Sequence, residues 1–281
     1  MKVLHTIQEV RTHLNSIDSN ESIGLVPTMG ALHQGHLSLI EHSNKVCEFT
    51  ITTIFVNPAQ FNKQEDLEKY PRTIEEDLEK LEKAGCDLVF IPEADEIYPG
   101  KPELSINLGV ITEELEGRFR PGHFNGVGLI ISKFFNIIEP NKAFFGQKDL
   151  QQYHVIKKLA FELNFPVEIV MVPTEREETG LAMSSRNLRL SETQRLEASL
   201  IFQTLQTAKE SLLKGRSINS VKSQAHVSFS KSESLTLEYF EVIHTSNFLP
   251  IEKVTDKDQT AICTAAEIGG VRLIDNLPLI S

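Results

Sequence analysis

Short apolar runs alternate with amphipathic segments along the first 175 residues, and this alternation predicts strands and helices in turn. The predicted strands are 22–28, 50–57, 87–92, 143–146 and 167–173. The helices predicted between them are 35–48, 73–85, 126–138 and 149–164. Strands that alternate with helices of this length form right-handed crossovers. The pattern therefore predicts an α/β fold with a doubly wound, mostly parallel sheet covered on both faces.

The rest of the chain has a different pattern. Two amphipathic helices are expected at 191–215 and 217–230, followed by strands near 236–243, 260–266 and 270–275. Strands that follow one another with short links favour an antiparallel sheet, so we expect a second, smaller α+β domain. The polar, irregular stretch near 175–187 separates the two patterns and predicts domains at 1–175 and 176–281.

Three local signals refine the helix ends. Thr73 begins the second helix of the first domain and Glu76 follows three residues later, which is the spacing of a capping box. Gly85 follows the last turn of that helix, where a residue in the left-handed conformation is expected. Ser191 is placed to cap the long helix of the second domain.

Composition restricts the kind of partner. The 281 residues are 40% hydrophobic and 24% charged, which is typical of a globular protein, and the formal net charge is −11. Duplex nucleic acid or an anionic membrane is unsuited as the main partner, because each needs a basic surface. The apolar stretches are far shorter than the roughly 20 residues of a membrane span, and the N-terminus lacks the apolar core of a signal peptide. We therefore expect a cytoplasmic protein.

Cysteine usage suggests neither a disulfide framework nor a zinc site. Cys47, Cys86 and Cys263 are odd in number, widely spaced, and form no CxxC pair. Three buried or half-buried thiols are the expectation, since free cysteine behaves as a small apolar residue.

The stretch "PTMGALHQGH", 27–36, follows the first predicted strand and leads into a helix. Ligands of open parallel sheets bind at this edge, where strands end and helices begin. Gly30 and Gly35 allow the backbone to approach a ligand, and a helix N-terminus favours an anion. His33 and His36 can face the same side and donate to phosphate oxygens or to a leaving group. A metal pair and ordinary surface histidines are the alternatives at this point.

Neither common nucleotide signature is present, because no GxxxxGK[ST] occurs and no GxGxxG directly follows the first strand. Instead "HQGH" resembles the signature of the nucleotidyltransferase superfamily that contains class I aminoacyl-tRNA synthetases and cytidylyltransferases. A second element of that superfamily is a mobile loop rich in basic or hydroxyl groups, and "MSSRN", 183–187, fits this description. Its two hydroxyls and one guanidinium suit a polyphosphate. A plain polar loop between domains is the alternative.

Further motifs narrow the resemblance to one family. In order they are "VPTMGALHQGH", "IFVNPAQF", "YPRT", "RPGHFNGV", "FFGQKDLQQ" and "MSSRN", from Val26 to Asn187. Their order and spacing are similar to those of the pantothenate synthetase family, the pantoate–β-alanine ligases, and "VRLIDN" at 271–276 extends the likeness. The resemblance implies a Rossmann-like domain that binds ATP and pantoate over 1–175, and a small α+β lid over 176–281.

The activity that the resemblance implies is that of an AMP-forming amide ligase. D-Pantoate and β-alanine would be joined with ATP, releasing AMP and pyrophosphate through an enzyme-bound pantoyl adenylate. Both chemical steps develop charge that positioned donors can stabilise. A cytidylyltransferase-type enzyme that retains the nucleotide in its product, and a nucleotide-binding sensor without activity, are the alternatives.

The resemblance also implies which residues act on ATP. The expected catalytic residues are His33, His36, Lys148, Ser184, Ser185 and Arg186. The expected ATP contacts are Met29, Gly30, Ala31, Leu32, His33, Gln34, Gly35, His36, Gly146, Gln147, Lys148, Asp149, Glu175, Met183, Ser184, Ser185 and Arg186. His36 is the residue usually labelled proton donor, and we expect mainly an electrostatic role because pyrophosphate leaves readily. A solvated lysine at position 148 and an N-cap at position 149 are the structural alternatives.

The acid substrate is assigned to amide side chains. By resemblance, Gln60 and Gln152 contact pantoate and Gln60 also lies near the β-alanine site, since an amide offers both donors and an acceptor. An apolar wall is expected from Pro27, Met29, Phe61, Val127 and Ile130. Asn57 and Tyr70 are weaker candidates, and a helix-entry turn is the alternative for Tyr70.

Magnesium is expected with ATP, held mainly by phosphate oxygens, and Asp77 is the candidate protein ligand. Its neighbours Glu75, Glu76 and Glu79 allow the alternative of a solvated acidic helix face. Glu175 departs from the small or apolar residue expected near adenine, so a contact there would use its backbone. Similar enzymes are usually homodimers formed through the nucleotide domain.

Overall fold

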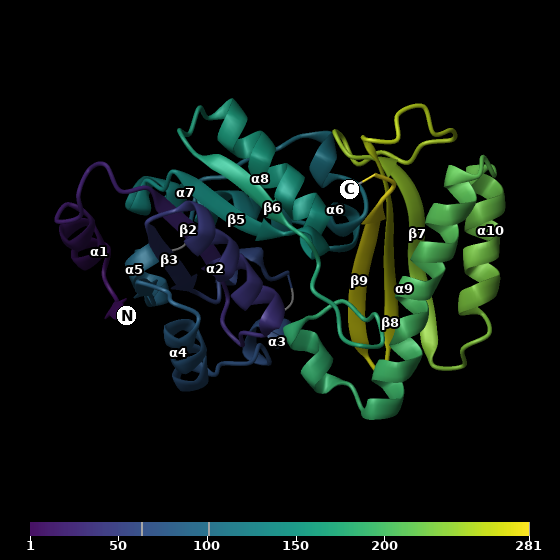
Figure 1. Cartoon of the computed structure of the whole chain (residues 1–281), viewed down its shortest axis with the longest axis horizontal. Coiled ribbons are helices and arrows are strands. Elements are labelled where there is room, and N and C mark those ends of the chain that lie inside the picture. The colour runs from purple at the N-terminus through teal and green to yellow at the C-terminus, as the bar shows by residue number, and fades with distance from the viewer. Residues whose placement is uncertain (63, 101, 281) are drawn as a thin grey trace. The chain divides into compact units, whose positions relative to one another are not determined.

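The computed structural model describes residues 1–62, 64–100 and 102–280 (Figure 1). The chain forms two compact units. The first comprises Met1–Gly146 and Gln152–Pro173, and the second comprises Gln147–Gln151 and Thr174–Ser281. The short segment Gln147–Gln151 therefore groups with the second unit, although it lies within the stretch assigned to the first domain. The limits 1–175 and 176–281, and the lid role, stay predictions.

A six-stranded parallel sheet forms the centre of the first unit. Its strands are β1 (Lys2–Leu4), β2 (Ile23–Thr28), β3 (Phe49–Ile54), β4 (Leu88–Phe90), β5 (Lys142–Gly146) and β6 (Glu168–Val172). They lie in the order β1-β4-β3-β2-β5-β6, and neighbours pair in parallel. From β2 the chain continues to β3 and β4 on one side, and later to β5 and β6 on the other. The predicted doubly wound α/β sheet is confirmed.

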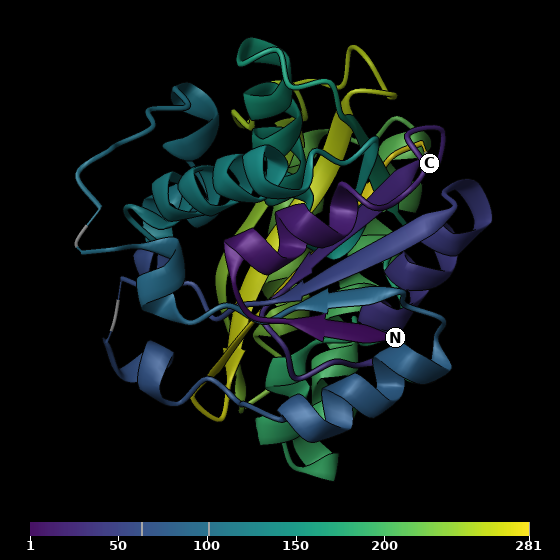
Figure 2. The ribbon, with the colours of Figure 1, turned by 90° about the vertical axis from the view of Figure 1, so that its left-hand side faces the viewer.

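Helices cover both faces of this sheet. The longer ones are α1 (Ile7–Leu14), α2 (Gln34–Val46), α4 (Ile74–Lys83), α7 (His123–Ile138) and α8 (Leu150–Glu162). Right-handed crossovers in the two directions place α2 and α4 on one face and α1 and α7 on the other, as Figure 2 shows. The shorter helices are α3 (Gln64–Glu68), α5 (Ala94–Ile97), α6 (Glu116–Phe119), η1 (Pro58–Gln60), η2 (Val110–Thr112) and η3 (Gln147–Asp149). These short helices, β1 and α1 were not predicted.

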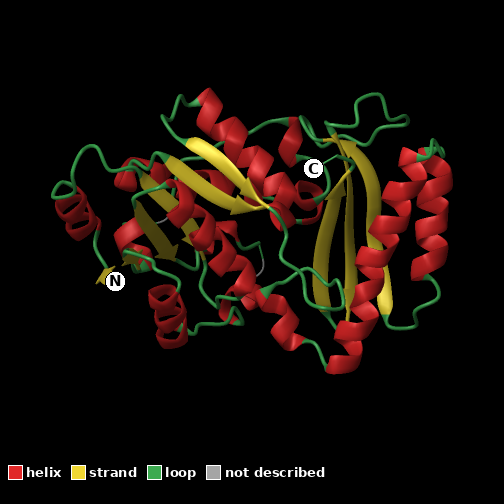
Figure 3. Cartoon of the chain, viewed as in Figure 1, coloured by secondary structure: helices red, strands yellow, loops and turns green. Residues whose placement is uncertain are grey.

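The second unit is a small α+β fold, as predicted. Strands β7 (Leu235–His244), β8 (Thr260–Ile268) and β9 (Val271–Pro278) pair antiparallel in chain order. Helices α9 (Glu192–Leu213) and α10 (Ile218–Phe229) pack together and share a core with the sheet that includes Leu205, Phe229 and Phe240 (Figure 3). The short helix η4 (Ser185–Arg189) precedes α9.

Two of the three helix-end predictions are confirmed. The Ser191 Oγ accepts from the Gln194 N–H at 3.2 Å, and Gly85 follows α4 with a φ of +79°. The capping box predicted for Thr73 and Glu76 is wrong, because Thr73 makes no side-chain cap on α4. The Thr73 hydroxyl instead donates to the Asp77 carboxylate at 3.2 Å. A buried acceptor one turn into the helix thus engages the hydroxyl that would otherwise cap it.

The cysteine prediction is also confirmed, since Cys47, Cys86 and Cys263 are free and buried. Burial raises the pKa of the Cys47 and Cys86 thiols, which keeps them protonated. Among the described helices, none is long and apolar enough to cross a membrane.

Candidate active site

The histidine loop, residues 28–36, connects β2 to α2. The strand order reverses between β2 and β5, and open parallel sheets bind ligands in the crevice beyond the carboxyl ends of such strands. Leu32 anchors the loop, because its side chain joins a buried cluster with Ile54 and with Leu81 of α4. The helix begins at Gln34, with His33 as its N-cap, one residue earlier than predicted.

The two histidines cap the helix with their own rings. The His33 Nδ1 accepts from the Gly35 N–H at 3.1 Å, and the His36 Nδ1 accepts more weakly from the His33 N–H at 3.4 Å. Their ring centroids are 4.1 Å apart. Because a backbone N–H can only donate, the neutral form of each ring carries its proton on Nε2. The pair is therefore set up as two Nε2–H donors, which suits an anionic ligand.

Asp77 on α4 supports this loop from inside the unit. Its side chain is fully buried, with 0% exposure, so the alternative of a solvated acidic face is wrong for this residue. The Asp77 Oδ2 accepts from the Ala31 N–H at 2.8 Å and Oδ1 accepts from the Leu32 N–H at 2.7 Å. Lys80, one turn later, donates to the Leu32 carbonyl at 2.9 Å. Helix α4 thus binds both polar backbone groups of Leu32.

The backbone of the loop explains why such support is needed. Gly30 has a φ of +80° and Ala31 a φ of +51°, in the left-handed region that a residue with a Cβ rarely adopts. A Cβ on Gly30 would lie 3.1 Å from the Asp77 Oδ2. Strained backbone of this kind persists only where the surroundings hold it.

Gln60 lies at the end of η1 in a network of buried hydrogen bonds. Its Oε1 accepts from the Asn57 Nδ2 at 3.1 Å, and the Asn57 Oδ1 accepts from the Tyr98 hydroxyl at 2.9 Å. Burial raises the pKa of Tyr98 to about 12, so this hydroxyl stays a donor. The Gln60 carbonyl lies 3.0 Å from the His123 Nδ1. Because Asn57 engages its oxygen, Gln60 is oriented to present its NH₂ group, whose Nε2 lies 3.1 Å from the Met29 sulfur.

Helix α7 approaches η1 closely enough to require glycine. A Cβ on Gly126 would lie 2.2 Å from the Ala59 carbonyl oxygen, and the Asn57 Nδ2 donates to the Gly126 carbonyl at 3.1 Å. The other residues expected from the sequence to contact the acid substrate differ in burial. Val127 and Ile130 on α7 are buried, while Pro27, Met29, Phe61, Tyr70 and Gln152 are half-buried. Tyr70 packs edge-on against Phe61, with ring centroids 5.8 Å apart.

In the second unit, the lysine segment, Gln147–Gln151, is tied to β9 by one side chain. The Asn276 Nδ2 donates to the carbonyls of Gln147 and Lys148, each at 2.9 Å. The Lys148 Nζ lies 3.2 Å from the Asp149 carboxylate, and the lysine side chain is only 19% exposed. Lys148 is therefore not the solvated helix-start lysine of the alternative reading.

A buried ion pair holds the hairpin that precedes η4. Arg176 donates to the Asp275 carboxylate at 2.7 and 2.9 Å, and its guanidinium lies 3.7 Å from the centre of the Phe202 ring. Burial raises the pKa of Asp275, and Arg176 opposes that rise. The Glu175 carbonyl accepts from the Met183 N–H at 2.9 Å. The backbone of Glu175, which stands where a small or apolar residue is expected, is therefore engaged within the hairpin.

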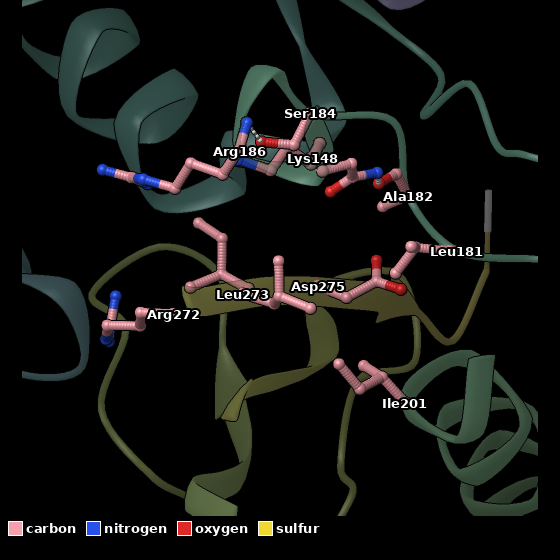
Figure 4. Close-up of a pocket in the computed structure, with 11 residues that line it drawn as sticks. Lys148, Leu181, Ala182, Ser184, Arg186, Ile201, Arg272, Leu273 and Asp275 are labelled. Carbon is pink, nitrogen blue, oxygen red and sulfur yellow. Dashed lines mark hydrogen bonds between the residues drawn. The ribbon is translucent and has the colours of Figure 1, made fainter. Parts of the chain in front are cut away.

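Cationic and hydroxyl groups line a pocket of the second unit. Figure 4 shows Lys148, Ser184 and Arg186 along one wall and Leu273 and Asp275 on the facing strand. The Ser184 Oγ accepts from the Arg186 N–H at 3.3 Å and caps η4. The other lining residues are Leu181, Ala182, Asn187, Ile201, Arg272 and Ile274. Ser185 is buried beside this loop. The structure therefore gathers the expected cations in one unit, and His33 with His36 in the other.

Sequence reasoning missed the residues that hold these groups in place. Asn276, Asp275 and Arg176 position the lysine segment and the hairpin, and Tyr98 and His123 position Gln60. A usable signal existed for the first two, because "VRLIDN" places Asp275 and Asn276 side by side in a strand whose other residues, apart from Arg272, are apolar. His123 lies within the motif "RPGHFNGV", whereas Arg176 and Tyr98 gave no signal, since their partners are far away in the sequence.

In the part of the chain that the structure describes, no group of three or more His, Cys, Asp or Glu could hold a metal ion. Both Asp77 oxygens already accept backbone N–H groups. A magnesium ion would therefore depend on ligand oxygens rather than on a cage of protein carboxylates.

Known proteins resemble this chain over almost its whole length. A family model described as pantoate-beta-alanine ligase matches residues 2–278. A pantothenate synthetase of Cytophaga hutchinsonii is 44% identical over 277 residues, covering 98% of each chain. The crystal structure of pantothenate synthetase from Thermus thermophilus matches with a TM-score of 0.93, 36% identity and full coverage of both chains.

A third relative carries ligands. The pantoate-beta-alanine ligase of Francisella tularensis, solved in complex with beta-gamma ATP and β-alanine, matches with a TM-score of 0.82 and 32% identity, covering 100% of this chain and 98% of that one. These matches do not favour the cytidylyltransferase alternative. This chain belongs to the pantoate–β-alanine ligase family.

Proposed function

We propose that this chain joins D-pantoate to β-alanine through an enzyme-bound pantoyl adenylate. The overall reaction is the ATP-dependent condensation to pantothenate, with release of AMP and pyrophosphate, and the chain is an AMP-forming amide ligase. The observation that carries this conclusion is the match over residues 2–278, together with a relative solved with beta-gamma ATP and β-alanine.

In the first step, a pantoate carboxylate oxygen attacks the α-phosphorus of ATP, and the bond to pyrophosphate breaks. We assign His33 and His36 to donate through Nε2–H to phosphate oxygens, as their capped Nδ1 atoms support. Lys148 and Arg186 supply positive charge and Ser184 and Ser185 supply hydroxyls from the second unit. Neutralising the developing charge lowers the barrier more than proton transfer does, because pyrophosphate is a good leaving group.

In the second step, the amine of β-alanine attacks the carbonyl carbon of the adenylate. A C–N bond forms, the C–O bond to AMP breaks, and the amine loses a proton. We assign Gln60 and Gln152 to pantoate, and Gln60 also to the neighbourhood of β-alanine. The oriented NH₂ group of Gln60 supports this, since it suits a carboxylate or hydroxyl oxygen.

Three finer assignments accompany this proposal. Mg²⁺ would be held mainly by ATP phosphate oxygens and would shield their charge, with Asp77 disfavoured as its ligand because backbone N–H groups engage both carboxylate oxygens. The family resemblance supports a homodimer formed through the first unit. The use of ATP supports a cytoplasmic location.

The decisive experiment is ATP–pyrophosphate exchange measured with and without pantoate. Exchange should require pantoate and should not require β-alanine, because the adenylate forms before the amine reacts. In the complete reaction, AMP and an amide product should appear in equal amounts. Exchange that ignores pantoate, or a stable nucleotidyl product, would reject the proposed sequence of steps.

A further inference from the structure

We propose that Asp77 is a positioning residue, which holds the histidine loop in the conformation that aims His33 and His36. Its effect on rate rests on the proposed function, whereas its effect on the loop does not. The residue was a candidate magnesium ligand from the sequence, and its surroundings point to a different role.

The hydrogen bonds of the Asp77 carboxylate support this role. Both oxygens are occupied: Oδ1 by the Leu32 N–H at 2.7 Å, and Oδ2 by the Ala31 N–H at 2.8 Å and the Thr73 hydroxyl at 3.2 Å. The side chain is 0% exposed. A buried carboxylate is costly unless its oxygens are satisfied, and here three donors satisfy them.

The backbone next to these hydrogen bonds is strained. Ala31 has a φ of +51° although it carries a Cβ, and its N–H is one of the two that Asp77 binds. The chain reaches His33 only two residues later, and the His33 and His36 rings depend on the path of that backbone for their caps. A change in the backbone at Ala31 would therefore move both Nε2–H groups.

The two hydrogen bonds from the Ala31 and Leu32 N–H groups require a carboxylate at position 77. An amide at position 77 would still accept one N–H through its oxygen, while its NH₂ group would face the second N–H. Two donors repel each other, so Asp77→Asn loses one bond and adds an unfavourable contact with almost no change in shape.

The test compares Asp77→Asn with Glu75→Gln, a matched control at an exposed position of the same helix. Hydrogen exchange should show the Ala31 and Leu32 amides exchanging at least about tenfold faster in Asp77→Asn and unchanged in Glu75→Gln. The pyrophosphate exchange rate should fall about 10- to 100-fold in Asp77→Asn, with the KM for ATP nearly unchanged.

Three further measurements separate positioning from other roles. The Mg²⁺ concentration for half-maximal rate should stay the same in Asp77→Asn, whereas loss of a metal ligand would raise it. Ala31→Gly, which relieves the positive φ, should restore part of the rate when added to Asp77→Asn. Lys80→Met removes the bond to the Leu32 carbonyl together with an exposed ion pair to Glu76, and should loosen the loop less.

The proposal is overturned by unchanged amide exchange in the loop of Asp77→Asn, or by a raised Mg²⁺ requirement. If the wild-type chain showed no pantoate-dependent exchange of pyrophosphate, the proposed function would fail, while the amide exchange would still decide the role of Asp77.

Discussion

The histidine loop of the first unit and the lysine segment of the second are held by opposite chemistry. A carboxylate, Asp77, binds backbone N–H groups of the loop, whereas an amide, Asn276, donates to backbone carbonyls of the segment. The functional groups of the two units differ as well. The histidine loop offers the Nε2–H donors of His33 and His36, whereas the second unit offers the positive charges of Lys148 and Arg186.

The two units also differ in how their buried carboxylates, Asp77 and Asp275, are paired. Asp77 accepts from uncharged donors, namely two backbone N–H groups and the Thr73 hydroxyl. Asp275 lines the same pocket as Lys148 and Arg186 and would weaken their attraction for an anion. The bidentate bond from Arg176 neutralises Asp275, which reduces the effect of this carboxylate on Lys148 and Arg186.

The largest expected effect is on the neutral donors. His36→Ala should slow adenylate formation by about 10² to 10⁴-fold and weaken ATP binding much less, because the contact is strongest to charge that develops in the transition state. His36→Gln keeps an N–H donor and should retain part of the rate. Pyrophosphate exchange and equilibrium ATP binding measure the two quantities. Equal losses in rate and affinity would indicate a plain binding role.

The next effect concerns the buried ion pair. Arg176→Met should lower the free energy of unfolding by about 3–5 kcal/mol, because it leaves the Asp275 carboxylate buried without its partner. Arg272→Met removes the more exposed pair with Glu238, where the two side chains are 24% and 31% exposed, and should cost at most about 1 kcal/mol. Urea unfolding compares the two.

Acid should partly rescue Arg176→Met. Burial already raises the pKa of Asp275, and the loss of Arg176 removes the opposing effect. A carboxyl with a raised pKa in the folded state takes up a proton more readily when folded, so stability rises as pH falls towards that pKa. A deficit that stayed constant from pH 8 to pH 5 would contradict the buried pair.

A smaller effect is expected at Asn276, which holds the lysine segment. Asn276→Asp replaces a side-chain NH₂ group, which donates to two carbonyls, with a carboxylate oxygen that can only accept. The rate of pyrophosphate exchange should fall about 10- to 100-fold, as it does when supporting hydrogen bonds are lost in metal sites. Glu267→Gln at an exposed position of β8 is the control. Val242→Ala, in the buried core of the second unit and outside the pocket, lowers stability alone and is the second control. If Val242→Ala reduced the pyrophosphate exchange rate as much as Asn276→Asp does for the same loss in the free energy of unfolding, general loosening of the second unit would be the better explanation.

The smallest effect is a difference in pH response. Burial, aided by Lys157, lowers the pKa of His154 on α8 to about 4. Between its ordinary value of about 6.5 and that value the unfolded chain binds more protons, so stability falls as pH drops, by at most about 1.4 kcal/mol per unit. Urea unfolding at pH 7 and pH 5 should show a smaller fall in His154→Gln. An identical fall would contradict this.

The alternation of apolar and amphipathic segments was sufficient for the fold of both units, because their longer helices and strands repeat a period over many residues. It missed the eight-residue helix α1, and it missed the three residues of β1 and the four- and five-residue helices, which are too short to show a period. It also misread Thr73, whose side chain turns to a buried carboxylate that no local spacing reveals.

By itself, the sequence determined which chemical groups are present: two histidines at a helix start, a lysine after the fourth predicted strand, and a serine–arginine loop, in the order of one ligase family. Only the tertiary structure decided how these groups are held. It buried Asp77 beneath the histidine loop, and it set Asn276 against a segment 128 and 129 positions earlier. Such contacts arise from the packing of distant elements, and hydrophobic period and motif spacing carry no information about them.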